Sequence, residues 1–283
     1  MIIKDQNSGK GPPVMDRSAI ADRYAADGEQ KILFSHLLDL MRRAEAGNRL
    51  TVSGFLTEAE SAGAEAMLKA AGCRNVVFFG GYPEAERRCA VFLPDYLEEA
   101  DVINEPATAG IVYLVARVSR FDRDRAELSH RDCLGSLMAL GLERDSLGDL
   151  VAEGGEAVLI VKTAVADYVA ENLTKIGRYP IGITRYDRYE VRPRADFTEE
   201  TDTVSSARLD AVTAAVFRLS RQNAADAITA GLVAVNGRPR TKGDGEVREG
   251  DKISLRGKGR IVFDRIEGTS QKGRLRFRFR RYR

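Results

Sequence analysis

The stretch Ser220–Gly237, SRQNAADAITAGLVAVNG, decides how the C-terminal part of the chain folds. Ser220 is typical of a helix N-cap, because its hydroxyl can accept a hydrogen bond from an amide of the first turn. Gly231 is placed to end that helix, since glycine readily adopts the left-handed conformation that follows a helix. The apolar run that comes next predicts a strand, and Asn236-Gly237 predicts a type I′ hairpin turn. A short helix that leads into a tight hairpin is therefore expected.

The flanking residues extend this unit in both directions. Before it, apolar residues at helical spacing from Leu209 onward predict another helix, and after it a strand is predicted at Ile253–Leu255. Two helices against a small sheet make a compact module. Arg221 and Gln222 occupy the first turn of the second helix, where free amides and the positive end of the helix dipole favour an anion.

The charge of the chain is unevenly distributed. The whole chain has a formal net charge of +2, but residues 206–283 contain 19 Lys and Arg against 8 Asp and Glu, whereas residues 1–205 contain 25 against 34. Basic residues follow the hairpin turn and the last strand of the module: Arg238, Arg240, Lys242, Arg256, Lys258 and Arg260. We expect them to share one side of the module and to form a basic surface that suits a phosphate backbone.

The sequence as a whole predicts an α+β chain of five segments. These are a flexible lead (residues 1–14), an N-terminal domain (15–105), a central domain (106–191), a linker (192–205) and the basic module (206–283). In the N-terminal domain two helices precede a two-stranded β-ribbon, and Thr57 with Glu60 forms a capping box at the start of the second helix. The linker is polar, contains Pro193 and has no period.

The central domain follows the order strand, helix, strand, strand, helix, strand. This βαββαβ order is that of a ferredoxin-like plait, which many RNA-recognition (RRM-like) domains share. Those domains stack bases on aromatic residues of the two central strands, and here these strands offer only Tyr113. We therefore interpret the plait as a scaffold or a protein-contact module.

No catalytic residue, metal site or cofactor is indicated by the sequence. His36 and His130 are the only histidines, and the three cysteines lack a metal-binding spacing. His130-Arg131-Asp132 matches the opening of a protein-kinase catalytic loop, but the other kinase motifs are absent, and Ser129 with Asp132 fits a helix cap. Asp210 stands where pseudouridine synthases have a catalytic Asp, yet a helix-start role suits it better.

The scattered cysteines favour a reducing cytoplasm, and no apolar run approaches the roughly 18 residues of a membrane span. We expect a cytoplasmic protein that does not enter a membrane.

The C-terminal module closely resembles the RNA-binding domain named after the fourth small-subunit ribosomal protein, here called the S-four (αL-type) domain. Its pattern of R-L-D, then S-R-x-x-A-x-x-x-I-x-x-G-x-V-x-V-N-G, then V-x-x-G-D-x-I is met at Arg208–Asp210, Ser220–Gly237 and Val247–Ile253. The resemblance implies RNA contacts from Arg208, Ser220, Arg221 and the basic residues after the hairpin turn. Pseudouridine synthases and RNA methyltransferases also carry this domain, so an RNA-modifying enzyme remains an alternative.

From Met15 to its end the chain looks like the bacterial YlmH family, also called RqcP-like, and its photosynthetic relatives. The segments FFGGYPEAERRCAVFLP, LSHRDCLGSLMALGLERDSLGDL, ENLTKIGR and RGKGRIVFDRIEGTSQKGRLRFRFRR carry this resemblance. It implies a non-catalytic factor of ribosome-associated quality control. Such a factor binds large-subunit rRNA and peptidyl-tRNA and supports the alanine-tailing factor at stalled chains, and we expect it to be a monomer off the ribosome. A role in photosystem assembly, known for photosynthetic relatives, ranks lower because no transit peptide is recognisable.

Overall fold

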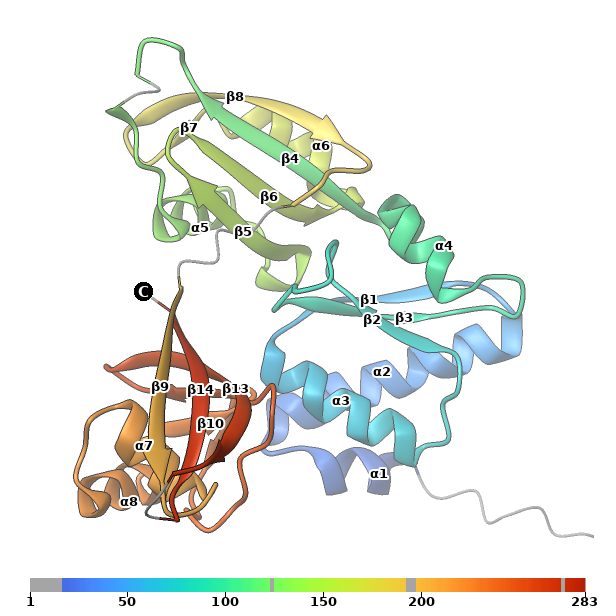
Figure 1. Cartoon of the computed structure of the whole chain (residues 1–283). Helices are drawn as coiled ribbons and strands as arrows, with labels where there is room; N and C mark the ends of the chain where they lie inside the picture. Colours follow the sequence, from blue (N-terminus) through green and yellow to red (C-terminus); the bar gives the residue numbers. More distant parts are fainter. Residues whose placement is uncertain (1–16, 123–124, 192–196, 271–272, 283) are drawn as a thin grey trace, which may run out of the picture.

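The computed structural model describes residues 17–122, 125–191, 197–270 and 273–282, which form three bodies in chain order (Figure 1). The predicted flexible lead, residues 1–14, lies outside the described residues. The chain is mixed α and β throughout, as expected.

The N-terminal body places three helices on one face of a three-stranded sheet with the order β1-β3-β2. Its elements are α1 (Arg17–Tyr24), α2 (Gly28–Gly47), β1 (Thr51–Leu56), α3 (Glu58–Ala70), β2 (Val76–Phe79) and β3 (Arg88–Phe92). The predicted capping box is confirmed: the Thr57 amide donates to a Glu60 carboxylate oxygen at 2.7 Å, and the Glu60 amide donates to Thr57 Oγ1.

The prediction of a two-stranded ribbon was wrong, because the segment that follows α2 in the chain forms a third strand, β1, which pairs with β3. Its sequence, TVSGFL, mixes polar residues and a glycine, so it has neither a clear alternation nor a long apolar run. Antiparallel pairing with β3 supplies the hydrogen bonds that hold it as a strand.

The central body follows the N-terminal body after α4 (Glu99–Asn104). Its elements are β4 (Ile111–Val118), α5 (His130–Met138), β5 (Leu147–Glu153), β6 (Glu156–Lys162), α6 (Thr163–Asn172), β7 (Lys175–Ile176) and β8 (Tyr179–Tyr186). They form an antiparallel sheet with the order β5-β6-β4-β8-β7, and α5 and α6 pack on one face. Helix α5 starts after Ser129, whose hydroxyl accepts from the Asp132 amide, so this stretch is a helix cap.

The N-terminal and central bodies share an apolar core. Phe55 and Phe79 of the small sheet pack against Ile111, Tyr113 and Ile160 on the other face of the central sheet. Tyr113 is only 1% exposed and donates a hydrogen bond to the Gly81 carbonyl. The one aromatic residue expected on the central strands is therefore covered by the N-terminal body.

The C-terminal body contains two helices and a six-stranded antiparallel sheet with the order β11-β10-β12-β13-β14-β9. Its elements are β9 (Phe197–Val204), α7 (Leu209–Val216), α8 (Arg221–Thr229), β10 (Val233–Val235), β11 (Arg238–Arg240), β12 (Lys252–Leu255), β13 (Gly259–Thr269) and β14 (Leu275–Tyr282). The hairpin prediction is confirmed, since Asn236 and Gly237 have φ angles of 51° and 73°.

The described part of the predicted linker, Phe197–Val204, is not a linker but strand β9. It pairs with β14 over eight residues, from Val204 opposite Leu275 to Phe197 opposite Tyr282. Its sequence, FTEETDTV, is too polar to predict a strand by itself. The strand is held by its pairing and by ion pairs with arginines of β14, such as Glu200 with Arg281 at 2.7 Å.

Candidate nucleic-acid interface

The N-termini of α7 and α8 carry the residues that the S-four pattern singles out. Arg208 precedes α7 and pairs with Asp210 in its first turn at 2.8 Å. Ser220 caps α8, and its hydroxyl accepts a hydrogen bond from the Asn223 amide at 3.1 Å. The helix-start interpretation of Asp210 is thus confirmed.

The electrostatics of this region are set by a carboxylate held between two cations. The pKa of Asp210 is lowered most by the hydrogen bond from Arg208. The hydrogen bond from the Ala211 amide and the charges of Arg208 and Arg221 lower it further, whereas burial raises it. Asp210 therefore stays ionised at neutral pH. Because Arg208 neutralises it, Arg221 remains as an additional cation.

Arg221 is exposed at the first position of α8, and its guanidinium donates to Ser205 Oγ at 2.8 Å. Gln222 is also exposed, but its amide is engaged by Asp226 at 2.9 Å. Of these two neighbours, Arg221 is the better placed to meet a phosphate.

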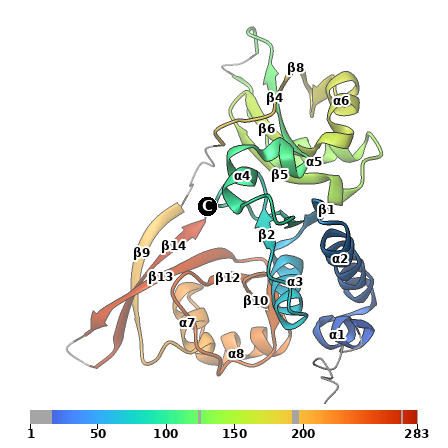
Figure 2. The same cartoon turned by 90° about the vertical axis from the view of Figure 1, so that its right-hand side faces the viewer.

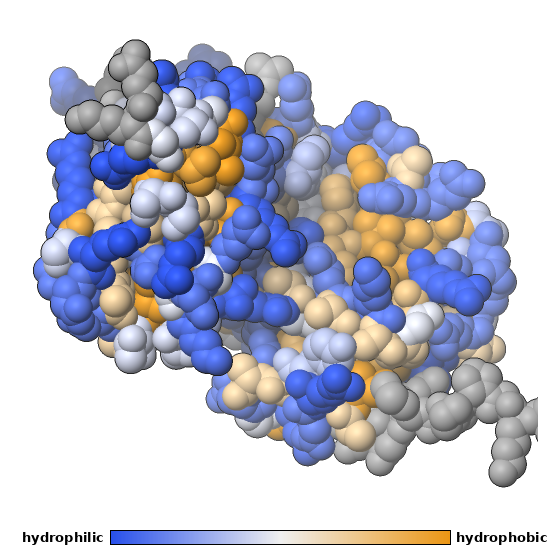
Figure 3. All heavy atoms as spheres, turned by 60° about the horizontal axis from the view of Figure 1, so that its bottom comes forward, coloured by the Kyte–Doolittle hydropathy of each residue, from blue (hydrophilic) through white to orange (hydrophobic). Residues whose placement is uncertain are grey.

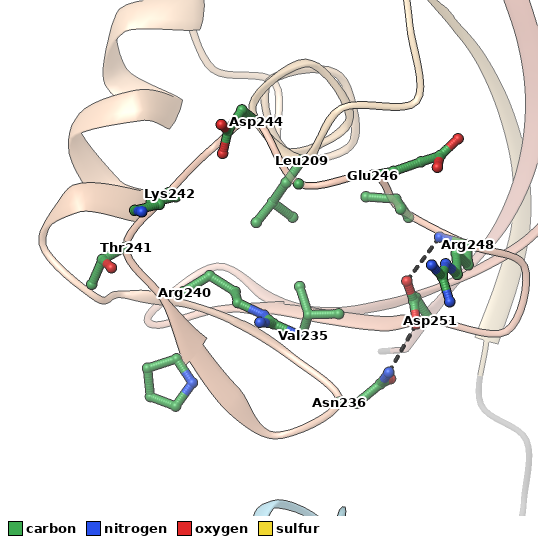
Figure 4. Close-up of a pocket in the computed structure, with 13 residues that line it drawn as sticks. Leu209, Val235, Asn236, Arg240, Thr241, Lys242, Asp244, Glu246, Arg248 and Asp251 are labelled. Carbon is green, nitrogen blue, oxygen red and sulfur yellow. Dashed lines mark hydrogen bonds between the residues drawn. The ribbon is translucent and has the colours of Figure 1, made fainter. Parts of the chain in front are cut away.

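An open depression of about 630 Å³ lies between the hairpin and the start of α7 (Figure 4). Leu209 and Val235 form its floor, and Asn236 is fixed at its edge by a hydrogen bond to Asp251 at 2.8 Å. Three cations and three carboxylates line it: Arg240, Lys242, Arg248, Asp244, Glu246 and Asp251. Because the charges balance, the depression by itself does not form an anion site.

The ten predicted RNA-binding residues lie in three places, and the six basic residues among them that were expected to share one side do not. One group lies at the helix starts and around the depression: Arg208, Ser220, Arg221, Gln222, Arg240 and Lys242. Arg256 and Lys258 lie apart from this group, in the exposed turn between β12 and β13. The Arg256 amide donates to the carbonyl of Leu232, which follows the C-terminal end of α8, whereas the first group lies at the N-terminal end of that helix. Arg238 and Arg260 face the N-terminal body instead.

The contact between the C-terminal and N-terminal bodies explains this correction. Arg260 forms an ion pair with Glu86, and the neighbouring Lys252 pairs with Glu58 at 3.1 Å. Arg238 lies over α3, because its guanidinium is 3.4 Å from the point that a Cβ atom would occupy if residue 63 were not glycine. The acidic first part of the chain thus occupies cations that the sequence alone leaves free. Figure 3 shows the two bodies from below, with hydrophilic side chains between them.

The Arg-rich end of the chain is also largely neutralised within the C-terminal body. Arginines of β14 pair with carboxylates of β9 and β13: Arg276 and Arg278 with Glu267, Arg278 with Glu199, Arg280 with Asp264 and Arg281 with Glu200. These cations are paired within the sheet, so the strong positive charge counted in the sequence overstates the charge that is available to a partner.

Arg218 is a cation that the sequence analysis missed. It lies between α7 and α8, is exposed, and has a φ of 53°, which is uncommon for a residue other than glycine. In the described part of the chain no hydrogen bond or salt bridge holds its side chain, although its charge acts on Glu200. Only its closeness in sequence to Ser220 could have drawn attention to it.

The fold and the helix starts define a multidomain S-four protein. A family model described as "S4 domain" matches residues 207–253, and one described as "Putative RNA-binding domain in YlmH" matches residues 117–190.

The chain is also 33% identical over 254 residues to "Ribosome-associated protein quality control protein P2" of Bacillus subtilis (strain 168), across 89% of this chain and 95% of that protein. It belongs to this family, the YlmH (RqcP) family, as the sequence motifs indicate. A solved structure, "Cell division protein ylmH from Streptococcus pneumoniae", is 19% identical, covers 58% of this chain and 94% of its own, and gives a TM-score of 0.45.

The described residues contain no cluster of three or more His, Cys, Asp or Glu side chains that could hold a metal ion. None of the helices described is long and apolar enough to cross a membrane.

Proposed function

We propose that this protein binds RNA and acts on the large ribosomal subunit in ribosome-associated quality control. The observation that carries the proposal is the near full-length similarity to a relative whose name states that role, together with an S-four domain whose helix starts present cations. In this proposal the protein contacts large-subunit rRNA and peptidyl-tRNA in the cytoplasm and supports alanine tailing of stalled chains by a separate factor.

The proposed RNA-binding face consists of Arg218, Arg221, Arg240 and Lys242, which lie around the starts of α7 and α8 or the adjacent depression. All four side chains are exposed, and within the described residues none forms a salt bridge. A cation that forms no internal ion pair can contact a phosphate without first losing one, which favours these four over Arg260 and the arginines of β14.

We also propose that the central body is a ferredoxin-like plait whose sheet face serves as a scaffold and not as a base-stacking surface. The order β8-β4-β6-β5 within its sheet and the alternation of its helices support this assignment. Burial of Tyr113 beneath the N-terminal body supports the scaffold interpretation, because that side chain is not accessible to a base.

Filter binding of large-subunit rRNA fragments at several salt concentrations tests the RNA-binding proposal. Each phosphate contact should contribute a loss of about 0.7–0.9 log units in affinity per log unit of salt. Arg221→Glu should weaken binding by about 2–4 kcal/mol, because it removes a charge-assisted hydrogen bond and adds a repelling charge. Arg185→Glu, which changes an arginine of the central body by the same charge, is the control. Equal effects of the two changes, or binding that is insensitive to salt, would contradict the proposed face.

Sedimentation in a sucrose gradient tests the ribosomal part of the proposal. The full-length protein should comigrate with free large subunits, and Arg221→Glu should move it toward the top of the gradient while Arg185→Glu does not. If the unchanged protein stays at the top, the ribosomal assignment fails even where RNA fragments bind.

A further inference from the structure

Two loops meet at the end of the central sheet that lies farthest from the C-terminal body. Strand β4 ends at Val118, which pairs with Ile181 of β8, so the chain after β4 and the turn before β8 are neighbours. Tyr179 connects them, because its hydroxyl donates to the Arg125 carbonyl at 3.4 Å. The loop after β4 projects from the top of the molecule in Figures 1 and 2.

These loops present two aromatic rings beside arginines. Phe121 is 98% exposed, which is the highest exposure of any large hydrophobic side chain in the described parts of the chain. The Arg178 guanidinium lies 4.9 Å from the centroid of the Tyr179 ring and donates to the Tyr179 hydroxyl at 2.7 Å. An exposed phenylalanine gains nothing from folding, so stability of this chain does not account for Phe121.

The described residues at this end of the sheet include charges of both signs. Exposed cations are supplied by both loops and by β7: Arg120, Arg125, Lys175 and Arg178. Carboxylates lie among them as well: Asp122, which accepts from Ser119 Oγ, Asp132, whose side chain is beside Gly177, Glu127 of the same loop, and Glu153 next to Gly154, whose carbonyl accepts from the Leu128 amide. The described charges at this end therefore balance, but each ring has an arginine beside it: Arg120 precedes the exposed Phe121, and Arg178 covers the half-buried Tyr179.

We infer that Arg120, Phe121, Arg125, Arg178 and Tyr179, the loop platform, form a binding site for single-stranded RNA. An unpaired base would stack on the Phe121 ring, and the surrounding arginines would contact the phosphates on either side of it. Aromatic rings interleaved with cations are the combination that single-stranded nucleic acid requires, since every base has a face that can stack. An acidic protein surface would use the cations but would have no need of a fully exposed ring.

This inference rests on the proposed RNA-binding function and adds a second contact to it. The loop platform lies at the opposite end of the molecule from the S-four helices (Figure 1). A single-stranded segment that reaches the platform is therefore a different part of the RNA from the segment held at α7 and α8.

Tryptophan fluorescence gives a direct test, because the chain contains no tryptophan. In full-length Phe121→Trp the only tryptophan is at the platform, and a base that stacks on it should quench its emission. Tyr96→Trp, at a position that is 67% exposed on the N-terminal side of the chain, is the matched control. Titration with a short single-stranded RNA should quench Phe121→Trp in a saturable way and leave Tyr96→Trp unchanged, and the corresponding duplex should quench neither.

Affinity provides the second measurement, by fluorescence anisotropy of the labelled single strand. Phe121→Ala should weaken binding about 5- to 150-fold, the range for loss of one stacked base, whereas Tyr96→Ala should not. Arg178→Glu should weaken binding as well and should lower its salt dependence.

The outcomes separate this inference from the proposed function. Binding that depends on Arg221, with no quenching of Phe121→Trp and with unchanged affinity of Phe121→Ala, would overturn the loop platform and leave the S-four face in place. If Phe121→Trp is not quenched and the unchanged protein binds no RNA, both the loop platform and the proposed function are overturned.

Discussion

Replacement of Arg87 by alanine should weaken the contact between the N-terminal body and the central body. Arg87 precedes β3, and its guanidinium bonds to three carbonyls: Phe55 at 3.0 Å, Arg144 at 2.8 Å and Leu147 at 2.8 Å. Its own amide bonds to Asp149 at 3.0 Å. Burial lowers the pKa of Arg87 below its usual value, and the charges of Glu60 and Asp149 oppose this effect only in part.

The size of the effect follows from the three carbonyls that lose a charged donor. Each buried acceptor left without a partner costs about 1–3 kcal/mol, and water can reach part of this half-buried site, so we expect a total loss of about 3–5 kcal/mol. For a unit of this size each kcal/mol lowers the melting temperature by about 2–4 °C, which gives a shift of about 6–20 °C.

Thermal unfolding followed by circular dichroism measures this shift. Arg88→Ala is the control, because Arg88 is the next residue, is 28% exposed and pairs with Glu65 on the surface at 3.0 Å. Loss of a surface pair should cost at most about 1 kcal/mol. If both variants shift the melting temperature equally, Arg87 does not hold the two bodies together and the reasoning is wrong.

Further predictions concern the C-terminal body and the thiols. Gly237→Ala should lower the free energy of unfolding, measured with denaturant, by more than Gly231→Ala does. Both glycines have a positive φ, but only a Cβ at position 237 would meet the Ala59 backbone of α3, at 2.8 Å. The hydrogen bond from Arg281 lowers the pKa of Glu200 in the folded protein. The stability that this carboxylate contributes is therefore fully present above its pKa in the unfolded chain, and it is lost as the pH falls through its pKa in the folded protein. Unfolding measured from about pH 5 down to pH 3 should therefore depend less on pH in Glu200→Gln than in the unchanged protein. Burial raises the pKa of all three thiols, to about 11 for Cys73 and Cys89 and about 12 for Cys133, so native alkylation at pH 8 should be much slower than alkylation of the unfolded chain.

The elements that sequence predicts well here are those with local signals. The capping box at Thr57, the cap at Ser220 and the Asn236-Gly237 turn each depend on residues within four positions of one another, so neighbouring letters suffice. Strands β1 and β9 depend on partners far away in the chain, and their own polar sequences carry little signal. A β9 strand became recognisable only beside the arginines of β14, which are more than seventy residues away.

The sequence by itself determined the family, the S-four pattern and the concentration of positive charge after residue 206. Only the tertiary structure decided which of those cations can meet a partner. Glu86 and Glu58 reach across from the N-terminal body to Arg260 and Lys252, and the carboxylates of β9 and β13 neutralise β14. The physical reason is that a net charge adds along the chain, whereas an ion pair depends on distance in space, which the order of residues does not specify.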